Sequence, residues 1–152
     1  RRSISIPLIS AGGIALGSQM KAAMILGADG VQIGSRFAAT VEASSHEKWK
    51  QKIVEAKEGD TQLTLKELAP VRLVKNKFFY EIEEIYKHGK DVEELKEKLG
   101  KRRAKRGMFE GDLEEGELEI GQSSALIDEI LTVEQVFHKL LKEFDEADFS
   151  KF

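Results

Sequence analysis

The sequence predicts an α/β protein that begins with two parallel strands joined by a helix. Residues 4–10 form a short run rich in Ile and Leu, interrupted only by Pro7, and residues 30–33 form a second apolar run. Between them, from Ser18 to Gly27, apolar residues recur at helical spacing. Strands joined by a crossover helix pair in parallel with a right-handed connection, so the carboxyl ends of both strands meet at one edge.

The residues after Phe37 predict a small appended region of mixed structure. Ser44 or Ser45 can cap a helix that contains Trp49. Residues 60–76 then alternate like short strands and turns. This change of pattern indicates an appendage to the strand–helix–strand unit.

The second half of the chain is predicted to be mostly helical. Residues 77–89 place aromatic and aliphatic side chains on one face, and residues 91–107 open with an Asp-x-x-Glu capping pair, so both are expected as charged surface helices. Residues 107–122 hold several glycines and many carboxylates and predict a loop. Two closing helices are expected over 123–131 and 132–144, the second opened by a Thr-x-x-Gln capping box and marked by a continuous apolar stripe.

Composition narrows the functional classes. The 24 basic and 27 acidic residues nearly cancel, so charge gives no reason to expect nucleic acid or a membrane as partner. The absence of cysteine excludes a disulfide, a thiolate nucleophile and a zinc–thiolate site within this chain, and we expect no metal. Without a signal peptide or a spanning apolar run, a cytoplasmic protein is expected. The chain starts without methionine and runs straight into a strand pattern, so we expect a piece of a longer protein.

Glycines follow both predicted strands. Gly12 and Gly13 end the first strand, and Gly34 followed by Ser35 ends the second. Backbone N–H groups at such loops hold a phosphate well, because glycine lets the backbone approach without a Cβ. In (β/α)8 barrels, the loops after strands seven and eight often make such a site. Taken alone, a glycine pair is also an ordinary turn, and the absence of G-x-G-x-x-G disfavours a Rossmann fold.

Several segments resemble one family in order and spacing. They are "IPLISAGGIALGSQMKAAMILGADGVQIGSRF", "SSHEKWKQKIVEA", "DTQLT", "PVRLVKNKF" and "GDLEEGELEIGQSSALI". Over nearly the whole chain, the sequence is similar to the FMN-dependent family of nitronate monooxygenases, formerly 2-nitropropane dioxygenases, and enoyl-acyl-carrier-protein reductase II. The segments "VKNKF" and "GQSSALI" favour the reductase-like branch.

The resemblance implies the C-terminal part of a (β/α)8 TIM barrel, comprising strands seven and eight with their helices and an inserted small cap domain. Residues 1–41 would hold the barrel strands and the FMN phosphate-binding loops. Residues 42–107 would form the cap on the substrate side. Residues 108–152 would supply an acidic loop and the helices that close the barrel.

The resemblance also implies the cofactor site. Gly13 would bind the FMN phosphate after the seventh strand, and Gln32, Ile33, Gly34 and Ser35 would complete the site at the eighth. The family's first six strands, flavin-ring contacts and active-site histidine precede the part matched by this chain. No catalytic residue is therefore assigned, and this chain alone is expected to be inactive.

The implied activity is that of enoyl-acyl-carrier-protein reductase II, in which NAD(P)H reduces enoyl thioesters through FMN in fatty acid synthesis. The substrate would be a small molecule or bound to acyl carrier protein. Nitronate monooxygenase, which oxidises alkyl nitronates with O2, is the close alternative. A barrel of the inosine-monophosphate dehydrogenase type is a weaker one, because that group depends on a cysteine nucleophile.

A further hypothesis comes from another class: a non-catalytic fragment or binding module that docks on a complementary chain. Two strands cannot close a barrel, so their edges and apolar face would stay exposed. The expected partner is a second copy of the chain, in a homo-oligomer, or the missing N-terminal half of the barrel.

Five features have both a structural and a functional interpretation. For Arg36 we favour bridging of carboxylates over binding of phosphate, and for Trp49 and Tyr86 we favour packing over substrate stacking. The basic run 101–106 could recognise an acidic carrier protein or nucleotide phosphates, but a solvated helix face is preferred. The carboxylates of 111–119 match no calcium-loop spacing and predict a repulsive surface loop.

Overall fold

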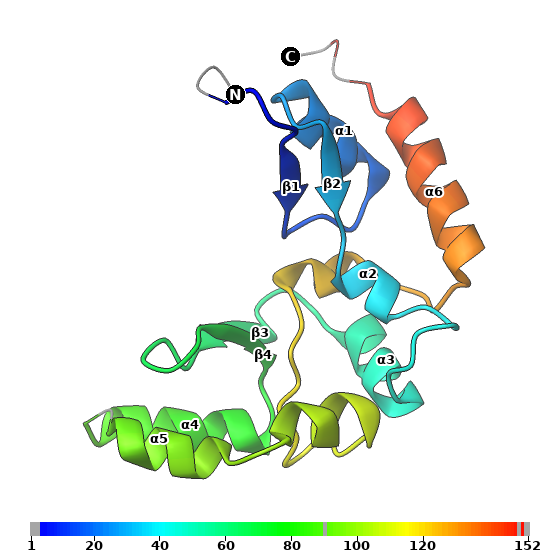
Figure 1. The fold of residues 1–152 in the computed structure, drawn as a ribbon. Coiled ribbons are helices and arrows are strands. Elements are labelled where there is room, and N and C mark those ends of the chain that lie inside the picture. Colours follow the sequence, from blue (N-terminus) through cyan, green and yellow to red (C-terminus); the bar gives the residue numbers. More distant parts are fainter. Residues whose placement is uncertain (1–3, 90, 149, 151–152) are drawn as a thin grey trace.

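The computed structural model describes residues 4–89, 91–148 and 150 and shows the mixed α/β class expected from the sequence. Figure 1 shows an elongated molecule, with the first and the last of the described helices at the end that holds the parallel strands. The elements in chain order are β1 (Ile9–Ala11), α1 (Gly17–Ile25), β2 (Gly30–Gln32), α2 (Ser35–Ala38), α3 (Glu47–Glu55), β3 (Thr61–Thr64), β4 (Val71–Val74), α4 (Lys77–Lys87), α5 (Val92–Leu99), the π-helix η1 (Lys105–Phe109), the 3-10 helix η2 (Gln122–Leu126) and α6 (Val133–Glu146).

The strand–helix–strand unit is confirmed. β1 and β2 pair in parallel, with Ile9 opposite Gly30 and Ala11 opposite Gln32. The first strand is shorter than the predicted 4–10, because the backbone N–H of Leu8 donates to the Asp29 carboxylate at 2.8 Å, outside the strand ladder. The crossover helix α1 ends as expected before a glycine of positive φ, Gly27, which any other residue would adopt only with strain.

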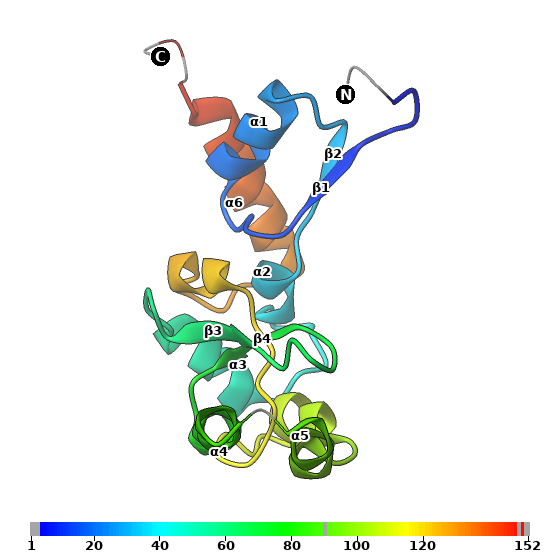
Figure 2. The same cartoon turned by 90° about the vertical axis from the view of Figure 1, so that its left-hand side faces the viewer.

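Helix α6 lies along α1 in both views (Figures 1 and 2). The contact is close at Gly17, where an added Cβ would lie 2.0 Å from the backbone oxygen of Leu140. The Glu143 carboxylate accepts the Gly17 N–H at 2.7 Å, and the Lys21 ammonium donates to the Ala147 carbonyl at 2.7 Å. The first turn of α1 is thereby fixed to the end of the chain.

Between β2 and α6, the chain forms a second lobe, residues 47–120, and then returns (Figure 2). Its β3–β4 hairpin is antiparallel, as the alternating pattern predicted, and Leu73 also bridges Glu119. Trp49 is 4% exposed within one apolar cluster, and Tyr86 packs against another, so the packing interpretation of both is confirmed. The second cluster contains Leu65, Leu73, Phe78, Phe79, Ile82, Ile85 and Leu95.

The caps of the predicted helices have mixed outcomes. The Thr132–Gln135 box at α6 is confirmed, and Asp91 caps α5 by accepting from the Glu93 N–H at 2.8 Å. The prediction that Ser44 or Ser45 caps α3 is wrong. The Ser45 hydroxyl instead donates to the Ala38 carbonyl at 2.9 Å, and the His46 ring accepts from the backbone of α3.

Two predicted helices are shorter than expected. The helix expected over 91–107 ends at Leu99, because Gly100 and Arg102 both have positive φ, and a π-helix follows. The helix expected over 123–131 is replaced by one 3-10 helix and an extended segment. Tertiary bonds hold that segment against α2 and the residues just after it: Arg36 of α2 donates to the Glu129 carbonyl at 2.8 Å, and the Val41 N–H donates to the Leu131 carbonyl at 2.9 Å.

Asn76, in the "VKNKF" segment, joins two parts of the second lobe. Its side-chain oxygen caps α4 by accepting the Phe79 N–H at 2.9 Å. Its amide group donates to the carbonyls of Leu113 at 2.9 Å and Gly116 at 2.8 Å. Asn76 is buried, so all three bonds are shielded from water.

Replacing Asn76 with Asp retains the capping oxygen but removes both donors and places a carboxylate against two buried carbonyls. We expect N76D to lower the free energy of unfolding by about 2–5 kcal/mol, measured by urea denaturation. The matched control is Asp91→Asn, which keeps the capping oxygen of α5 at an exposed position. Similar losses in both variants would contradict the dual role of Asn76.

Candidate functional site

The two glycine loops lie side by side at the carboxyl edge of β1 and β2. Gly13 follows Ala11 by two positions, and Gly34 follows Gln32 by two positions, while Ala11 and Gln32 are direct partners in the parallel pair. Neighbouring strands are about 4.8 Å apart, so the two loops begin as adjacent segments. This is the arrangement that a shared phosphate requires.

The glycines of these loops leave open space in front of the backbone. Gly12 and Gly13 have φ values of +92° and +72°, so both positions favour glycine by conformation. Gly34 has an ordinary φ of −97°. A Cβ built on any of the three would meet no atom within 4 Å, and all three are exposed. The backbone is therefore accessible to a ligand on both loops.

Ser35 is the first residue of α2, next to Gly34, and its side chain is hydrogen-bonded to a segment far along the chain. Its hydroxyl oxygen accepts the Gly121 N–H at 3.1 Å, across 86 positions of sequence. A hydroxyl that accepts one bond still has its own proton to donate. Gln32 is exposed and Ile33 is half-buried, so the predicted residues of the second loop lie together at the strand end. Their role in cofactor binding stays a prediction.

Two cavities adjoin the loops. Gly13 lines one of about 470 Å³ on the side of α1, whereas Gly34 and Ser35 line another of about 490 Å³ on the side of the second lobe. The walls of the second cavity also come from Ala38, Trp49, Pro70, Val71, Arg72, Met108, Glu119, Ile120 and Gly121. The sequence did not predict the contributions of β4 and Gly121, because only tertiary contacts bring them to the loop.

The Arg36 side chain points into the interior of the protein. It is 4% exposed, and its Nη1 donates to the Glu129 carbonyl at 2.8 Å. Burial lowers the pKa of the guanidinium, while the carboxylates of Glu129, Asp128 and Glu143 oppose that shift. Arg36 is thus a link to the segment before α6, although its hydrogen bond is to a carbonyl and not to a carboxylate as expected.

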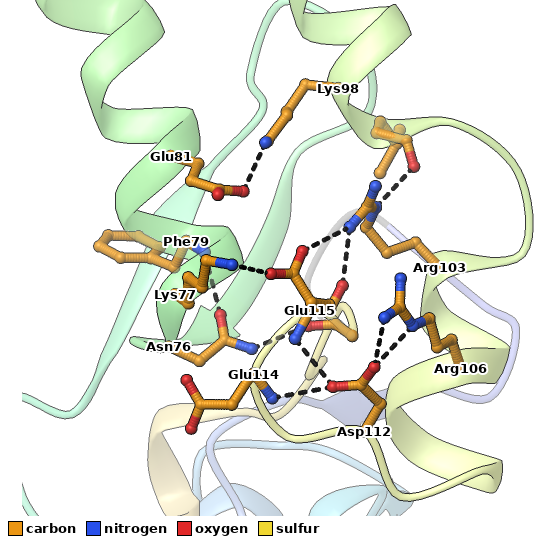
Figure 3. A network of polar contacts seen from close by, with 12 residues as sticks. Asn76, Lys77, Phe79, Glu81, Lys98, Arg103, Arg106, Asp112, Glu114 and Glu115 are labelled. Carbon is orange, nitrogen blue, oxygen red and sulfur yellow. Dashed lines mark hydrogen bonds and ion pairs between the residues drawn. The ribbon is translucent and has the colours of Figure 1, made fainter.

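The basic run and the acidic loop bind each other (Figure 3). Arg106 pairs with Asp112 at 2.6 Å, and Arg103 donates to the Glu115 carbonyl at 2.7 Å. Lys77 also pairs with the Glu115 carboxylate. The prediction of a repulsive loop is therefore wrong, because opposite charges close in sequence neutralise one another. The basic run is exposed at Lys101, Arg102, Lys105 and Arg106, as expected for a solvated face, although Arg106 is also ion-paired.

The acidic loop is further ordered by its own backbone. The Asp112 carboxylate accepts the N–H groups of Glu114 at 3.1 Å and Glu115 at 2.9 Å. The bond from Glu115 is the main cause that lowers the pKa of Asp112, and Arg106 adds to it.

Within the described residues, no three His, Asp or Glu side chains are grouped to hold a metal ion. In the same part of the chain, no helix is long and apolar enough to cross a membrane.

Comparison with known proteins identifies the family. The family model described as nitronate monooxygenase matches residues 1–143. The chain belongs to the nitronate monooxygenase family. This is an oxidoreductase family, so the predicted resemblance and the predicted enzyme class are both confirmed.

One curated relative and two solved structures show how far the similarity of this nitronate monooxygenase family member extends. A probable nitronate monooxygenase of Bacillus subtilis (strain 168) is 52% identical over 62 residues, which are 41% of this chain and 18% of the relative. The structure of FabK from Thermotoga maritima is 43% identical with a TM-score of 0.86, covering 95% of this chain and 46% of that one. Nitroalkane oxidase from Streptomyces ansochromogenes is 30% identical with a TM-score of 0.72, covering 97% and 42%. The chain thus spans less than half of each of these proteins.

One buried carboxyl group in this nitronate monooxygenase family member was not predicted. Glu117 is 9% exposed, and its backbone N–H donates to the Arg103 carbonyl at 3.1 Å. Burial is the largest cause that raises the pKa of the Glu117 carboxyl, to about 7 in all; the neighbouring Glu119 acts in the same direction, and Arg103 opposes the shift. In the segment "EGELE", carboxylates alternate with uncharged residues, and this pattern did not predict that the middle carboxylate is buried.

The raised pKa of Glu117 makes stability fall as pH rises from its ordinary value of 4.5 to about 7. In that window the folded state holds a proton that the unfolded state releases. We expect Glu117→Gln to raise the free energy of unfolding by about 1–2 kcal/mol at pH 8 and to change it little at pH 4.5. Thermal unfolding across pH measures this, with the exposed Glu97→Gln as control. An equal effect of E117Q at both pH values would contradict the buried, protonated carboxyl.

Proposed function

We propose that this chain is the C-terminal part of an FMN-dependent oxidoreductase, most like enoyl-acyl-carrier-protein reductase II. The observation that carries the proposal is the pair of open glycine loops at neighbouring parallel strand ends in a member of this family. The similarity to FabK over 95% of the chain supports the reductase branch.

In this proposal, β1 and β2 are strands seven and eight of a TIM barrel. Residues 1–41 would carry the phosphate loops, residues 42–107 a cap, and residues 108–152 the acidic loop and closing helices. The return of the chain from the second lobe to α6, beside α1, supports an inserted domain.

The loops fit the phosphate of FMN. Gly13 and Gly34 offer open backbone on adjacent loops, and the Ser35 hydroxyl can donate a bond to a phosphate oxygen. Gln32 and Ile33 would set the path of the second loop. FMN, when bound, supplies the relay of hydride from NAD(P)H to the enoyl double bond, and the residues of this chain bind and orient it. The catalytic residues are proposed to lie in the rest of the barrel.

Nitronate monooxygenase activity is the second candidate. The matching family model and the relative in Bacillus subtilis carry that name, and one similar structure is a nitroalkane oxidase. The alkyl nitronate and O2 would then replace the enoyl thioester and NAD(P)H.

We also propose that the apolar face near β1 and α1 is covered by the rest of the barrel or by a second copy. Ile6, Ile9 and Leu26 are 69%, 54% and 87% exposed, which is unfavourable for aliphatic side chains. Leu26 also lines the cavity that Gly13 lines.

Gly34 gives the sharpest test of the cofactor site. Its φ suits alanine and a Cβ there meets no atom, so Gly34→Ala should keep stability or raise it by up to about 1 kcal/mol. The same Cβ would occupy the space proposed for the phosphate. We expect the Kd for FMN, followed by flavin fluorescence in the full-length enzyme that contains this chain, to rise at least tenfold. Gly34→Asp should weaken binding further by charge repulsion. Unchanged affinity in both variants would place the phosphate elsewhere.

Turnover separates the two candidate activities. We expect the full-length, FMN-loaded enzyme to oxidise NAD(P)H rapidly only when an enoyl thioester is present. Oxygen uptake with an alkyl nitronate and without nicotinamide would instead favour the monooxygenase. If the enzyme neither oxidises NAD(P)H with an enoyl thioester nor consumes oxygen with an alkyl nitronate, both candidate activities are contradicted.

A further inference from the structure

Arg72, on β4, has hydrogen-bonding capacity that the protein does not use. Its Nη1 donates to the Thr61 carbonyl at 3.0 Å and to the Thr61 hydroxyl at 3.2 Å. Among the described residues, the other guanidinium nitrogens have no acceptor and no carboxylate pairs with Arg72. A guanidinium edge with spare donors is the group that binds phosphate oxygens best.

Arg72 also forms a wall of two cavities. One is the 490 Å³ cavity that begins at Gly34 and Ser35. The other, of about 650 Å³, lies between the start of β3 and η2 and includes Lys57 and Gln122. A ligand bound against Arg72 therefore has room both toward the proposed flavin loop and away from it.

The charges around Arg72 suit a nucleotide better than a bare phosphate. Lys57 is exposed and supplies a second cation on the larger cavity. Each cavity also has one carboxylate on its wall, Glu58 on the larger and Glu119 on the smaller, and both are exposed. In dinucleotide sites, a carboxylate near the pyrophosphate accepts bonds from the ribose hydroxyls. Two cations beside two carboxylates thus match a phosphate flanked by sugars.

The basic run 101–106 is a poor alternative for this role. Arg106 is paired with Asp112 and Lys105 with Glu110 at 3.3 Å. Arg103 donates to two backbone carbonyls and stacks over the Phe78 ring at 4.6 Å. Binding a phosphate at Arg103, Lys105 or Arg106 would require breaking these bonds, and the exposed Lys101 and Arg102 line neither cavity.

We propose that Arg72, assisted by Lys57, binds the pyrophosphate of a reduced nicotinamide dinucleotide. The identity of this ligand rests on the proposed reductase function, whereas the phosphate-binding role of Arg72 rests on its free donors and its two cavities. The phosphate group of a phosphopantetheine thioester has related chemistry and is the alternative source that the experiment must distinguish.

The test uses the FMN-loaded, full-length enzyme and ADP as probe, because ADP carries a pyrophosphate and ribose but no reducible ring. We expect calorimetry to show ADP binding that weakens at least tenfold in Arg72→Gln and about threefold in Lys57→Gln. The matched control, Arg102→Gln, replaces an exposed arginine in neither cavity and should bind ADP normally. In turnover, R72Q should raise KM for NAD(P)H with kcat and the Kd for FMN nearly unchanged, a split that general loss of structure would not give.

Three results would overturn the proposal. One is that the wild type does not bind ADP, or that R72Q binds ADP as tightly as the wild type does. Another is a raised KM for the enoyl thioester with normal KM for NAD(P)H, which would assign Arg72 to the phosphate of phosphopantetheine. If R72Q unfolds, Lys57→Glu replaces it at an exposed position, and unchanged ADP affinity in that variant is the third. Arg72-dependent ADP binding without any NAD(P)H oxidation would leave the site standing and refute only the reductase function.

Discussion

The close contact of α1 with α6 is the constraint on which the arrangement of the chain depends. Gly17 lies so near the Leu140 carbonyl that no side chain fits between them. The β1–β2 pair has only three residues in each strand, too little to be stable alone. Helix α6 covers one side of this unit and holds the start of α1 through Glu143. Both ends of the second lobe are thereby fixed, and Gly121 is brought to Ser35.

Within the second lobe, charge neutralisation decides which cations are left for function. The acidic loop is anchored by Asn76 and then satisfies Arg103, Arg106 and Lys77. A net charge of −3 conceals this segregation, since the pairing is local. Arg72, on the other side of the same hairpin, has only Thr61 as hydrogen-bond partner among the described residues. The distribution of partners therefore separates structural cations from one that is available to a ligand.

The sequence predicted the features whose causes are local. The glycine after α1, the Thr132 capping box and the parallel pair of strands depend on residues within one or two turns or on a general rule of chain connection. The sequence failed where a distant partner competes. Ser45 bonds Ala38 instead of capping α3, and the extended segment before α6 follows its contacts with α2. For the same reason the glycine loops were found from sequence, whereas the cavity wall at Gly121 was not.

Gly34 is the position where structure alone does not account for the residue. Gly12 and Gly13 are explained by their positive φ, and Gly17 by its neighbour. Gly34 has an ordinary φ and open space, so alanine would cost nothing in the folded state, while glycine costs about 0.5–1 kcal/mol of backbone entropy. A residue that lowers stability without a packing or conformational reason indicates that the space in front of it is used. On an edge shared with Gly13, that space suits an anion held by backbone N–H groups.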